Sequence, residues 1–377
     1  MMKVYIITCH NVYNAGASLQ AYALVTYLNN LGYEAKIIDY TPNYLSRYRL
    51  LGINSKRYDK PVLRELYQIV KLPGRLKKRL SPKKRAYDHF TRKLPLTGNY
   101  HSYSELLSDP PLADVYLAGS DQIWNTLFSN GKDPAFYLDF VPAGRIRASY
   151  AASFAAEDIT EEWKPQIRKW LQHFDDISVR ESSGLRIINN LGIPGAVQVC
   201  DPVFLLSCTQ WEELEEPLQL EEPYLLVYDF DSNPQIREFC TEASCKYGWK
   251  IYSILKNDYC DRCFHQKGPT AFLTLLRHAE FVVSNSFHAM AFSLMFQKQF
   301  VVFRRNERIN TRMEDLLELL SLKHVLDPEC FPPKPIDYDA VNPALIRFVD
   351  FSKTYISSVM EKAVQHNLSK EHINDRE

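Results

Sequence analysis

Short apolar runs alternate with segments of helical periodicity along most of the chain. The first apolar run, KVYIIT at 3–8, is followed by a polar loop and by the helical pattern LQAYALVTYLNNLG, which ends at Gly32. The next predicted strand is EAKIIDY at 34–40. Strand, helix and strand in this order predict a βαβ unit with parallel strands and a right-handed crossover.

The same alternation continues, and it restarts after an acidic segment. Further strands are predicted at VYLAGS (115–120), RASYAAS (147–153), DISVRE (176–181), AVQVCD (196–201), YLLVYDF (224–230), WKIYSIL (249–255), FVVSNS (281–286) and FVVF (300–303). Most of these runs lack polar alternation, which is typical of strands covered on both faces. A Glu/Pro-rich segment at 212–223 separates the two sets and indicates a linker.

Two α/β domains are therefore the simplest interpretation. We expect an N-terminal domain over 1–211, a C-terminal domain over 222–335 and a last helix over 340–370 that packs across them. Both domains are expected to be Rossmann-like and to face a cleft. Ligands of open parallel sheets bind at the carboxyl ends of the strands, so the site is expected in this cleft.

Composition removes several classes of function. Lysine plus arginine equal aspartate plus glutamate at 45 each, so the total charge does not call for nucleic acid. Eight scattered cysteines favour a reducing cytoplasm, and no apolar stretch is long enough to predict a membrane span. Cys260 and Cys263 in CDRC, with His265, are a weak match to a zinc site, and free thiols are the favoured interpretation. We expect no metal and no cofactor.

Residues 47–93 stand apart, with sixteen lysines and arginines against three acidic residues. Apolar residues interleave with these charges at helical spacing, which predicts a basic helical insertion. One interpretation is a solvated insertion, and the other is a basic surface that contacts anionic lipid or a phosphorylated acceptor. A cytoplasmic protein, with peripheral contact to the inner face of the membrane as the alternative, follows from these features.

Polar residues follow two of the predicted N-terminal strands. Asn14 and Gly16 precede the first helix, where unpaired N–H groups favour polar ligand oxygens, but the dinucleotide fingerprint is missing and NAD is not predicted. GSDQIWN at 119–125 follows a buried strand and surrounds a tryptophan with polar groups, which suits a hydroxyl-rich ligand. Capping of a helix by Ser120 or Asp121 is the alternative.

Two ionisable residues lie where buried strands end. Arg180 requires an anionic partner, which is either Glu181 or another protein carboxylate, or the carboxylate or phosphate of a ligand. His288 falls in the first turn of the helix after FVVSNS, where it is expected to act as a neutral base in the empty site and as an acid beside an anionic ligand. A core or capping histidine is the alternative. Asp201, before Pro202, is predicted to form a turn.

An ordered set of motifs resembles the polysaccharide pyruvyl transferases. The matching segments are ITCHNVYNAGASLQAYAL, LAGSDQIWN, YLDFVPAGRIRASYAASF, ISVRESSG, VCDPVFLL and VSNSFHAMAFSLMFQKQFVVF. The resemblance implies a GT-B-like fold and transfer of a pyruvyl group from phosphoenolpyruvate to two hydroxyls of a sugar, with phosphate released and no metal. The family's Arg-Leu-His motif is replaced here by Ser286, Phe287 and His288, so Arg304 or Arg305 is expected to supply the missing cation.

The expected site is divided between donor and acceptor. His288 and Arg180 are the predicted catalytic residues, and the predicted donor-binding residues are Asn285, Ser286, Phe287, Arg304 and Arg305. The predicted acceptor contacts are Asn14, Gly16, Asp121, Gln122, Trp124 and Asn125, and a lipid-linked oligosaccharide is one form of acceptor considered. Two rival functions remain, a glycosyltransferase that uses a nucleotide sugar and a non-catalytic saccharide-binding protein.

Overall fold

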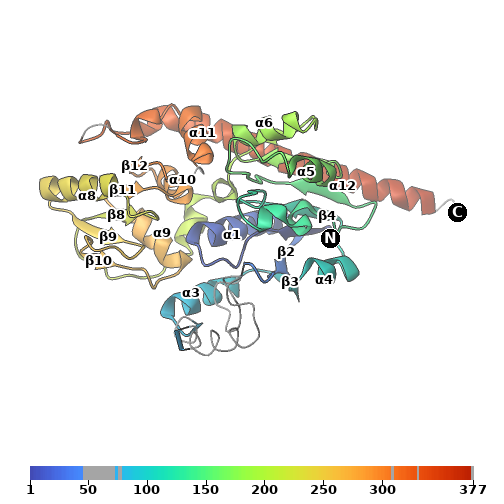
Figure 1. Cartoon of the computed structure of the whole chain (residues 1–377), viewed down its shortest axis with the longest axis horizontal. Coiled ribbons are helices and arrows are strands. Elements are labelled where there is room, and N and C mark those ends of the chain that lie inside the picture. Colours follow the sequence, from blue (N-terminus) through green and yellow to red (C-terminus); the bar gives the residue numbers. More distant parts are fainter. Residues whose placement is uncertain (46–72, 75–78, 307–309, 329–330, 375–377) are drawn as a thin grey trace.

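The computed structural model describes residues 1–45, 73–74, 79–306, 310–328 and 331–374, with side chains as far as 369. Among these residues the chain forms two α/β units that lie side by side, each built on a five-stranded sheet (Figure 1). Every strand pair in the two sheets is parallel. The predicted fold class of two Rossmann-like units is confirmed.

The N-terminal sheet has the order β3-β2-β1-β4-β5. Its strands are β1 (Lys3–Ile7), β2 (Glu34–Tyr40), β3 (Leu96–Tyr100), β4 (Val115–Ala118) and β5 (Ile146–Ser149). Its helices are α1 (Ala15–Asn30), α3 (Pro82–Thr91), α4 (Tyr103–Ser108), α5 (Lys164–Leu171), α6 (Ser182–Asn190) and α7 (Cys208–Glu212), with short 3₁₀ turns η2 (Asn130–Lys132), η3 (Pro134–Tyr137) and η4 (Pro202–Leu205). The strand order switches direction at β1, which places a binding site at its carboxyl end.

The C-terminal sheet has the order β10-β9-β8-β11-β12. Its strands are β8 (Tyr224–Tyr228), β9 (Lys250–Ser253), β10 (Arg262–Cys263), β11 (Phe281–Ser284) and β12 (Phe300–Val302). Its helices are α8 (Pro234–Tyr247), α9 (Pro269–Arg277), α10 (Phe287–Met295) and α11 (Thr311–Leu319), with the 3₁₀ turn η5 (Lys323–Val325). Strand order again switches direction at β8, so each unit has its own switch point, where ligands of open parallel sheets bind.

Local sequence signals explain where these elements begin and end. Helix α8 starts after the Asn233 cap, with Pro234 in its first turn, and it stops at Gly248, which adopts a left-handed conformation at φ 71°. Proline lacks the N–H that the first turn leaves unpaired, and glycine tolerates the left-handed end. Two predicted strands, DISVRE and AVQVCD, shrink to β6 (Ser178–Val179) and β7 (Val197–Gln198), because the residues after them turn into the site.

A shared hydrophobic core joins the two units. Trp211 is fully buried, with its ring 6.0 Å from that of Tyr22 on α1 and 5.0 Å from that of Phe292 on α10. The cluster to which it belongs contains side chains of both units. Burial of large aromatic side chains is a main source of folding stability, so the units are packed against each other and are not merely tethered.

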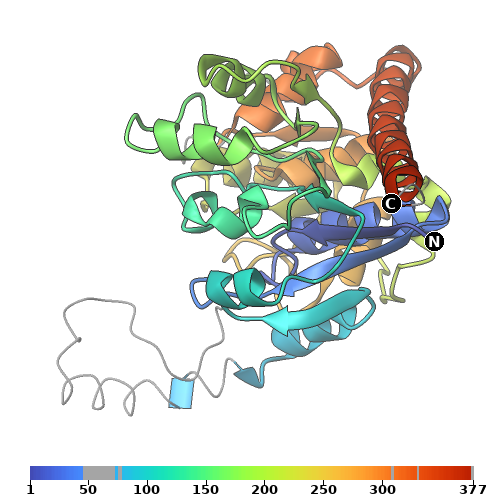
Figure 2. The same ribbon diagram turned by 90° about the vertical axis from the view of Figure 1, so that its right-hand side faces the viewer.

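The last helix, α12 (Tyr338–Asn374), crosses from the C-terminal unit to the N-terminal unit (Figures 1 and 2). Near its start, the Tyr338 hydroxyl donates to the carbonyl oxygens of Lys298 and Ser293. Further along, the Tyr355 hydroxyl donates to the Ser149 carbonyl at 2.9 Å, and Ser352 Oγ accepts from the Cys200 N–H at 2.8 Å. The prediction that the last helix packs across both units is confirmed.

Three sequence-based predictions stay predictions: the basic insertion, its contact with a membrane surface and the domain boundaries. Most of the basic insertion predicted at 47–93 lies outside the described residues, and only its end, including α3, is described. Contact with a membrane surface therefore stays a prediction, as do the boundaries of the two domains. Within the described part of the chain, no helix has the length and apolarity needed to cross a membrane.

Candidate functional site

A small cavity, here called the inner cavity, lies between the two units at the carboxyl ends of their strands. Its volume is about 110 Å³. The N-terminal unit contributes Asn14, Asp121 and Gln122, and the rest of the lining comes from the C-terminal unit: Phe230, Asn285, Ser286, Phe287, His288, Arg305, Asn310, Arg312 and Met313. The cleft expected from the sequence is therefore lined by eight of the thirteen predicted site residues: Asn14, Asp121, Gln122, Asn285, Ser286, Phe287, His288 and Arg305.

His288 lies in the first turn of α10, as the sequence predicted. Ser286 caps this helix, since its side chain accepts a hydrogen bond from the N–H of Ala289. The imidazole is buried and packs directly on Gly16 of α1, where an added Cβ would lie 2.1 Å from His288 Nδ1. Gly16, predicted as an acceptor contact, does not line the inner cavity. It instead provides the space in which the histidine ring sits.

Asp201 connects the histidine to a buried arginine. Its Oδ2 lies 2.8 Å from Arg180 Nη2 and 3.6 Å from His288 Nε2, while Oδ1 accepts from the N–H of Val203 and begins η4. Burial by itself raises the pKa of Asp201, but the Arg180 charge and the His288 side chain outweigh it and lower the pKa to about 2. The predicted turn is present, and the same carboxylate also orients the site.

Arg180 has Asp201 as its main partner and not Glu181. Its guanidinium also donates to the Ser120 hydroxyl and lies 3.7 Å from Asp121 Oδ1. Glu181 instead accepts from the Ser153 hydroxyl and from the N–H groups of residues 154 and 155. Arg180 is 4% exposed and is not part of the inner cavity wall, so its predicted catalytic role stays a prediction.

Arg312, on α11, is a site residue that the sequence did not reveal. It lines the inner cavity although it is 6% exposed, and its Nη1 lies 3.4 Å from Asp121 Oδ1. Burial and the nearby Arg180 charge lower the pKa of Arg312 to about 10, so it stays protonated at neutral pH. Its buried Nε has no hydrogen-bond partner among the described residues. A buried donor of this kind indicates an absent acceptor.

The ring of Phe287 contacts both buried arginines. The Arg180 and Arg312 guanidinium carbons lie 5.1 Å and 5.3 Å from the centre of its ring. Cation–π contacts of this kind stabilise charge without using the N–H donors, which remain available for hydrogen bonds. Phe287 was predicted as a donor-binding residue, and its ring is in contact with both cations.

Other predicted donor-binding residues differ in their surroundings. The Asn285 amide is occupied, because it accepts from Phe230 N–H at 2.9 Å and donates to Asp229 at 2.8 Å, and it fixes the loop that forms one wall. Arg305 lines the cavity and bonds to Asp231 at 3.0 Å. Arg304 is outside the inner cavity, about half exposed, and bonds to Glu314 and Asp327. Arg305, not Arg304, is therefore the arginine of this pair at the cavity.

On the acceptor side, two predictions are wrong. Trp124 is fully buried, stacks on Tyr137 at 5.6 Å and donates to the Phe136 carbonyl, so no ligand can reach its ring. Asn125 is also fully buried, and its amide bonds to Gln122 and to the backbone of Leu127. Both residues are part of the buried interior, because the chain after β4 folds inward there.

Three acceptor-side residues line the cavities: Asn14, Asp121 and Gln122. Asn14 caps α1 by accepting from Ala17 N–H at 3.2 Å, and Asp121 adopts a left-handed conformation at φ 73°. This conformation is uncommon outside glycine and asparagine and is often found at functional sites. A second, larger space, here called the middle cavity, has a volume of about 360 Å³ and shares Asn14, Asp121, Gln122 and Arg305 with the inner cavity.

The cysteines of the CDRC segment, a weak match to a zinc site in the sequence, have other partners in the structure. Cys263 Sγ lies 3.2 Å from His265 Nδ1, and Cys260 Sγ contacts the Asn257 carbonyl. Among the described residues no group of three or more His, Cys, Asp and Glu side chains is arranged to hold a metal ion.

Fold and site together define a two-domain α/β protein with buried cations and a histidine at a small interdomain cavity. The sequence profile of the polysaccharide pyruvyl transferase family matches residues 14–307, and the chain belongs to this family. The family is one of transferases that act on polysaccharide. Its profile covers every predicted site residue.

Similar solved structures share only the outline of the fold. A UDP-N-acetylglucosamine 2-epimerase from Rickettsia bellii has 11% identity and a TM-score of 0.47, with 97% of this chain and 98% of that chain covered. The heptosyltransferase WaaC of E. coli has 11% identity and a TM-score of 0.39, with 80% and 88% covered. No curated protein sequence matches the chain.

Proposed function

We propose that this protein transfers a pyruvyl group from phosphoenolpyruvate to two hydroxyls of a sugar, which forms a cyclic ketal and releases phosphate. The observation that carries the proposal is the placement of Arg312, Arg305 and His288 around one small cavity in a chain of this family. Phosphoenolpyruvate has a carboxylate and a phosphate on three carbons, and planar guanidinium groups bind both anions well.

The size of the inner cavity supports a small donor. Its volume of about 110 Å³ is well below the roughly 300–1,000 Å³ that is usual for sites of larger organic ligands. A nucleotide sugar would have to extend far outside it. Arg312 replaces the arginine that is missing from the 286–288 motif, and the first turn of α10 adds N–H groups for an anion.

In the proposed reaction, His288 donates a proton to the methylene carbon of phosphoenolpyruvate, and C2 becomes electrophilic. The first sugar hydroxyl forms a bond to C2 and gives up its proton, which restores the charge of the histidine. The bond between C2 and the phosphate oxygen then breaks, the second hydroxyl bonds to C2, and its proton leaves with the phosphate. Asp201 stays ionised and stabilises the protonated imidazole through the 3.6 Å contact.

The arginines have two different parts in this scheme. Arg312 and Arg305 line the cavity and neutralise the donor anions there. Arg180 acts at one remove, because it holds Asp201 on the side facing His288 and lies beside Asp121. The middle cavity, with Asp121 and Gln122 in its wall, is the place for the sugar ring that accepts the pyruvyl group.

Phosphate release from phosphoenolpyruvate in the presence of a glycan acceptor tests the proposal. His288→Ala is expected to reduce the rate about 100-fold or more and to leave phosphoenolpyruvate binding within a few-fold of wild type. Arg312→Ala is expected to weaken this binding tenfold or more in titration calorimetry, because a charged hydrogen bond is lost. Arg237→Ala, on the outer face of α8, is the matched control and is expected to change neither quantity.

Two results would contradict the proposal. One is full activity in the His288→Ala or Arg312→Ala protein. The other is thermal stabilisation of the wild type by nucleotide sugars and not by phosphoenolpyruvate, which would favour a glycosyltransferase. Stabilisation by saccharide alone would favour a non-catalytic binding protein.

A further inference from the structure

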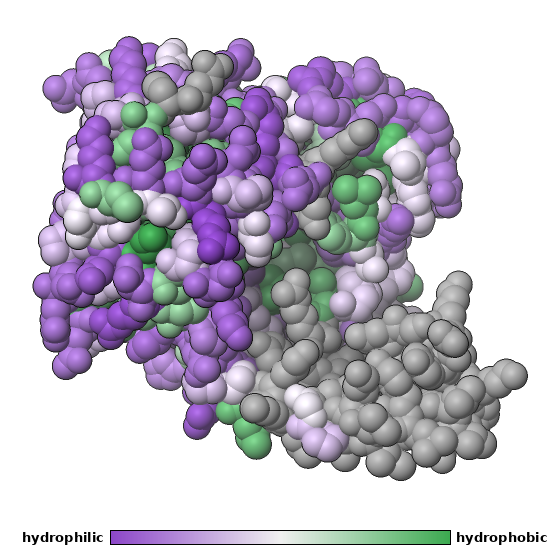
Figure 3. All heavy atoms as spheres, turned by 60° about the vertical axis from the view of Figure 1, so that its left-hand side comes forward, coloured by the Kyte–Doolittle hydropathy of each residue, from purple (hydrophilic) through white to green (hydrophobic). Residues whose placement is uncertain are grey.

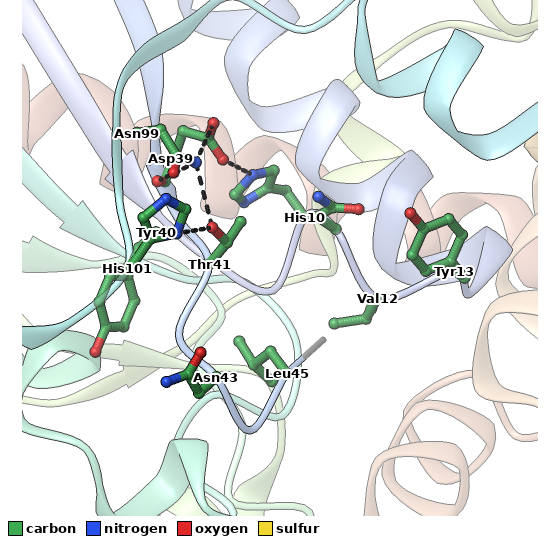
Figure 4. Close-up of a pocket in the computed structure, with 11 residues that line it drawn as sticks. His10, Val12, Tyr13, Asp39, Tyr40, Thr41, Asn43, Leu45, Asn99 and His101 are labelled. Carbon is green, nitrogen blue, oxygen red and sulfur yellow. Dashed lines mark hydrogen bonds and ion pairs between the residues drawn. The ribbon is translucent and has the colours of Figure 1, made fainter. Parts of the chain in front are cut away.

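A third space, here called the outer cavity, lies in the N-terminal unit at the carboxyl ends of β1, β2 and β3. Its volume is about 500 Å³. Figure 4 shows the polar side chains that surround it, contributed by three separate segments: His10, Asp39, Thr41, Asn43, Asn99 and His101. None of these residues takes part in the proposed chemistry at His288.

The polar groups of the outer cavity form a connected network. His10 Nε2 lies 3.0 Å from Asp39 Oδ1, and Asn99 Nδ2 donates to Asp39 Oδ2 at 2.7 Å and to Thr41 Oγ1 at 3.2 Å. Thr41 Oγ1 in turn lies 3.3 Å from His101 Nδ1. Hydrogen bonds between strand ends fix these side chains before any ligand arrives, and preformed polar groups bind sugars at a low cost in entropy.

Charge sets the chemical class of the ligand. Burial raises the pKa of Asp39, but its hydrogen bonds to His10 and Asn99 outweigh this effect and leave the pKa below its usual value. The carboxylate is therefore ionised at neutral pH and accepts hydrogen bonds from hydroxyls. No lysine or arginine is among the described residues that line the outer cavity, and His10 is already engaged by Asp39 at 3.0 Å, so an acidic sugar would find no lysine or arginine partner among these residues.

The outer cavity is continuous in its walls with the other two cavities. It shares Val12 and Leu45 with the middle cavity, which shares four residues with the inner cavity. The three cavities therefore lie in series, from the small cationic site at the domain interface to the large neutral-to-anionic space on the N-terminal unit. Figure 3 shows that much of one face of the molecule is hydrophilic, with apolar residues in a recess of this face.

We propose that the outer cavity binds a second sugar ring of the acceptor, at least one ring away from the ring that receives the pyruvyl group. The acceptor is then an uncharged oligosaccharide of two or more rings, and Asp39 and His101 select it through its hydroxyls. This inference rests on the proposed function for the direction of the acceptor, but the binding of the second ring is independent of any reaction.

Binding without phosphoenolpyruvate tests the outer cavity directly. The wild-type full chain is applied to an array of neutral and acidic glycans of one to four rings, and the dissociation constant of the best neutral glycan is then measured by calorimetry. We expect neutral glycans of two or more rings to bind more tightly than monosaccharides and than acidic glycans of equal length.

Variants locate the binding. His101→Ala and Asn43→Ala change exposed side chains, and Asp39→Asn preserves the shape of the Asp39 side chain. All three variants are therefore expected to keep the fold. Each is expected to weaken the longer glycan about tenfold and to leave phosphoenolpyruvate binding unchanged. His173→Ala and Asn190→Ala change exposed side chains that do not line the outer cavity, so these variants are the matched controls and are expected to bind as wild type does.

Each failure has a separate meaning. Glycan affinity that does not change in the three variants overturns the outer cavity as a subsite, and tighter binding of acidic glycans overturns the assigned sugar class. If the wild-type protein releases no phosphate from phosphoenolpyruvate but the glycan results are as expected, the proposed function is overturned and the outer cavity remains a sugar subsite.

Discussion

At the scale of single residues, Asp201 is the carboxylate that lies between Arg180 and His288 at the site. One oxygen caps η4, and the other lies between Arg180 and His288. Burial raises the pKa of this carboxylate, but the Arg180 charge and the His288 side chain outweigh it, so the folded protein favours the ionised form more than the unfolded chain does. Its contribution to stability is therefore present above the unfolded pKa of about 4 and is lost as the pH falls towards 2.

Asp201→Asn removes this contribution and leaves the shape of the side chain. We expect the free energy of unfolding at pH 7 to fall by roughly 2 kcal/mol or more, since a buried charge loses its partner. The difference from wild type is expected to narrow between pH 4 and pH 2, as measured by urea unfolding. Asp350→Asn, exposed on α12, is the control. An equal difference at all pH values would contradict this account.

At the scale of elements, the site depends on how α1 meets the start of α10. Gly16 is buried and is the second residue of α1. Here the hydrogen of glycine is required, because His288 occupies the space of a Cβ. The contact therefore sets the distance between the two units at the place where the inner cavity forms.

Gly16→Ala is expected to reduce phosphate release tenfold or more, because the new methyl group displaces the imidazole or separates the helices. Steady-state kinetics and the circular dichroism of the variant are the measurements. Gly98→Ala, where nothing lies within 4 Å of an added Cβ, is the matched control and is expected to keep full activity. Unchanged activity in Gly16→Ala would show that the helices have more freedom than this packing indicates.

At the scale of the whole molecule, α12 ties the two units together from outside the cleft. It bonds to the C-terminal unit through Tyr338 and to the N-terminal unit through Ser352 and Tyr355. Ser352 is fully buried and satisfies the Cys200 N–H, next to Asp201 in the chain. The hydrogen bond between Ser352 and Cys200 therefore restrains the backbone next to Asp201 on the side away from the inner cavity.

Ser352→Ala leaves the buried Cys200 N–H without a partner. We expect the free energy of unfolding to fall by about 1–3 kcal/mol, which thermal and urea unfolding will measure. Ser357→Ala, exposed on the same helix, is expected to have no effect beyond a few tenths of a kcal/mol. Equal stability of both variants would mean that water or a local shift satisfies the N–H.

Sequence by itself indicated the family and the strands of the two parallel sheets except β3 and β10, which were not predicted. Apolar runs such as YLLVYDF contain strand β8, whose five residues are all buried, because a strand covered on both faces must be apolar along its whole length. The position of His288 was also predictable, since a serine cap and an apolar helix follow β11 directly in the chain. These features depend on neighbours within a few residues.

Only the tertiary structure decided which polar and aromatic side chains reach the site. Arg312 lines the cavity from α11, far along the chain from Arg180, and no spacing in the sequence connects the two. Trp124 lies in a polar motif that suits a sugar, yet it is turned into the core against Tyr137. Such outcomes follow from contacts between distant segments, where burial and packing override what the local pattern favours.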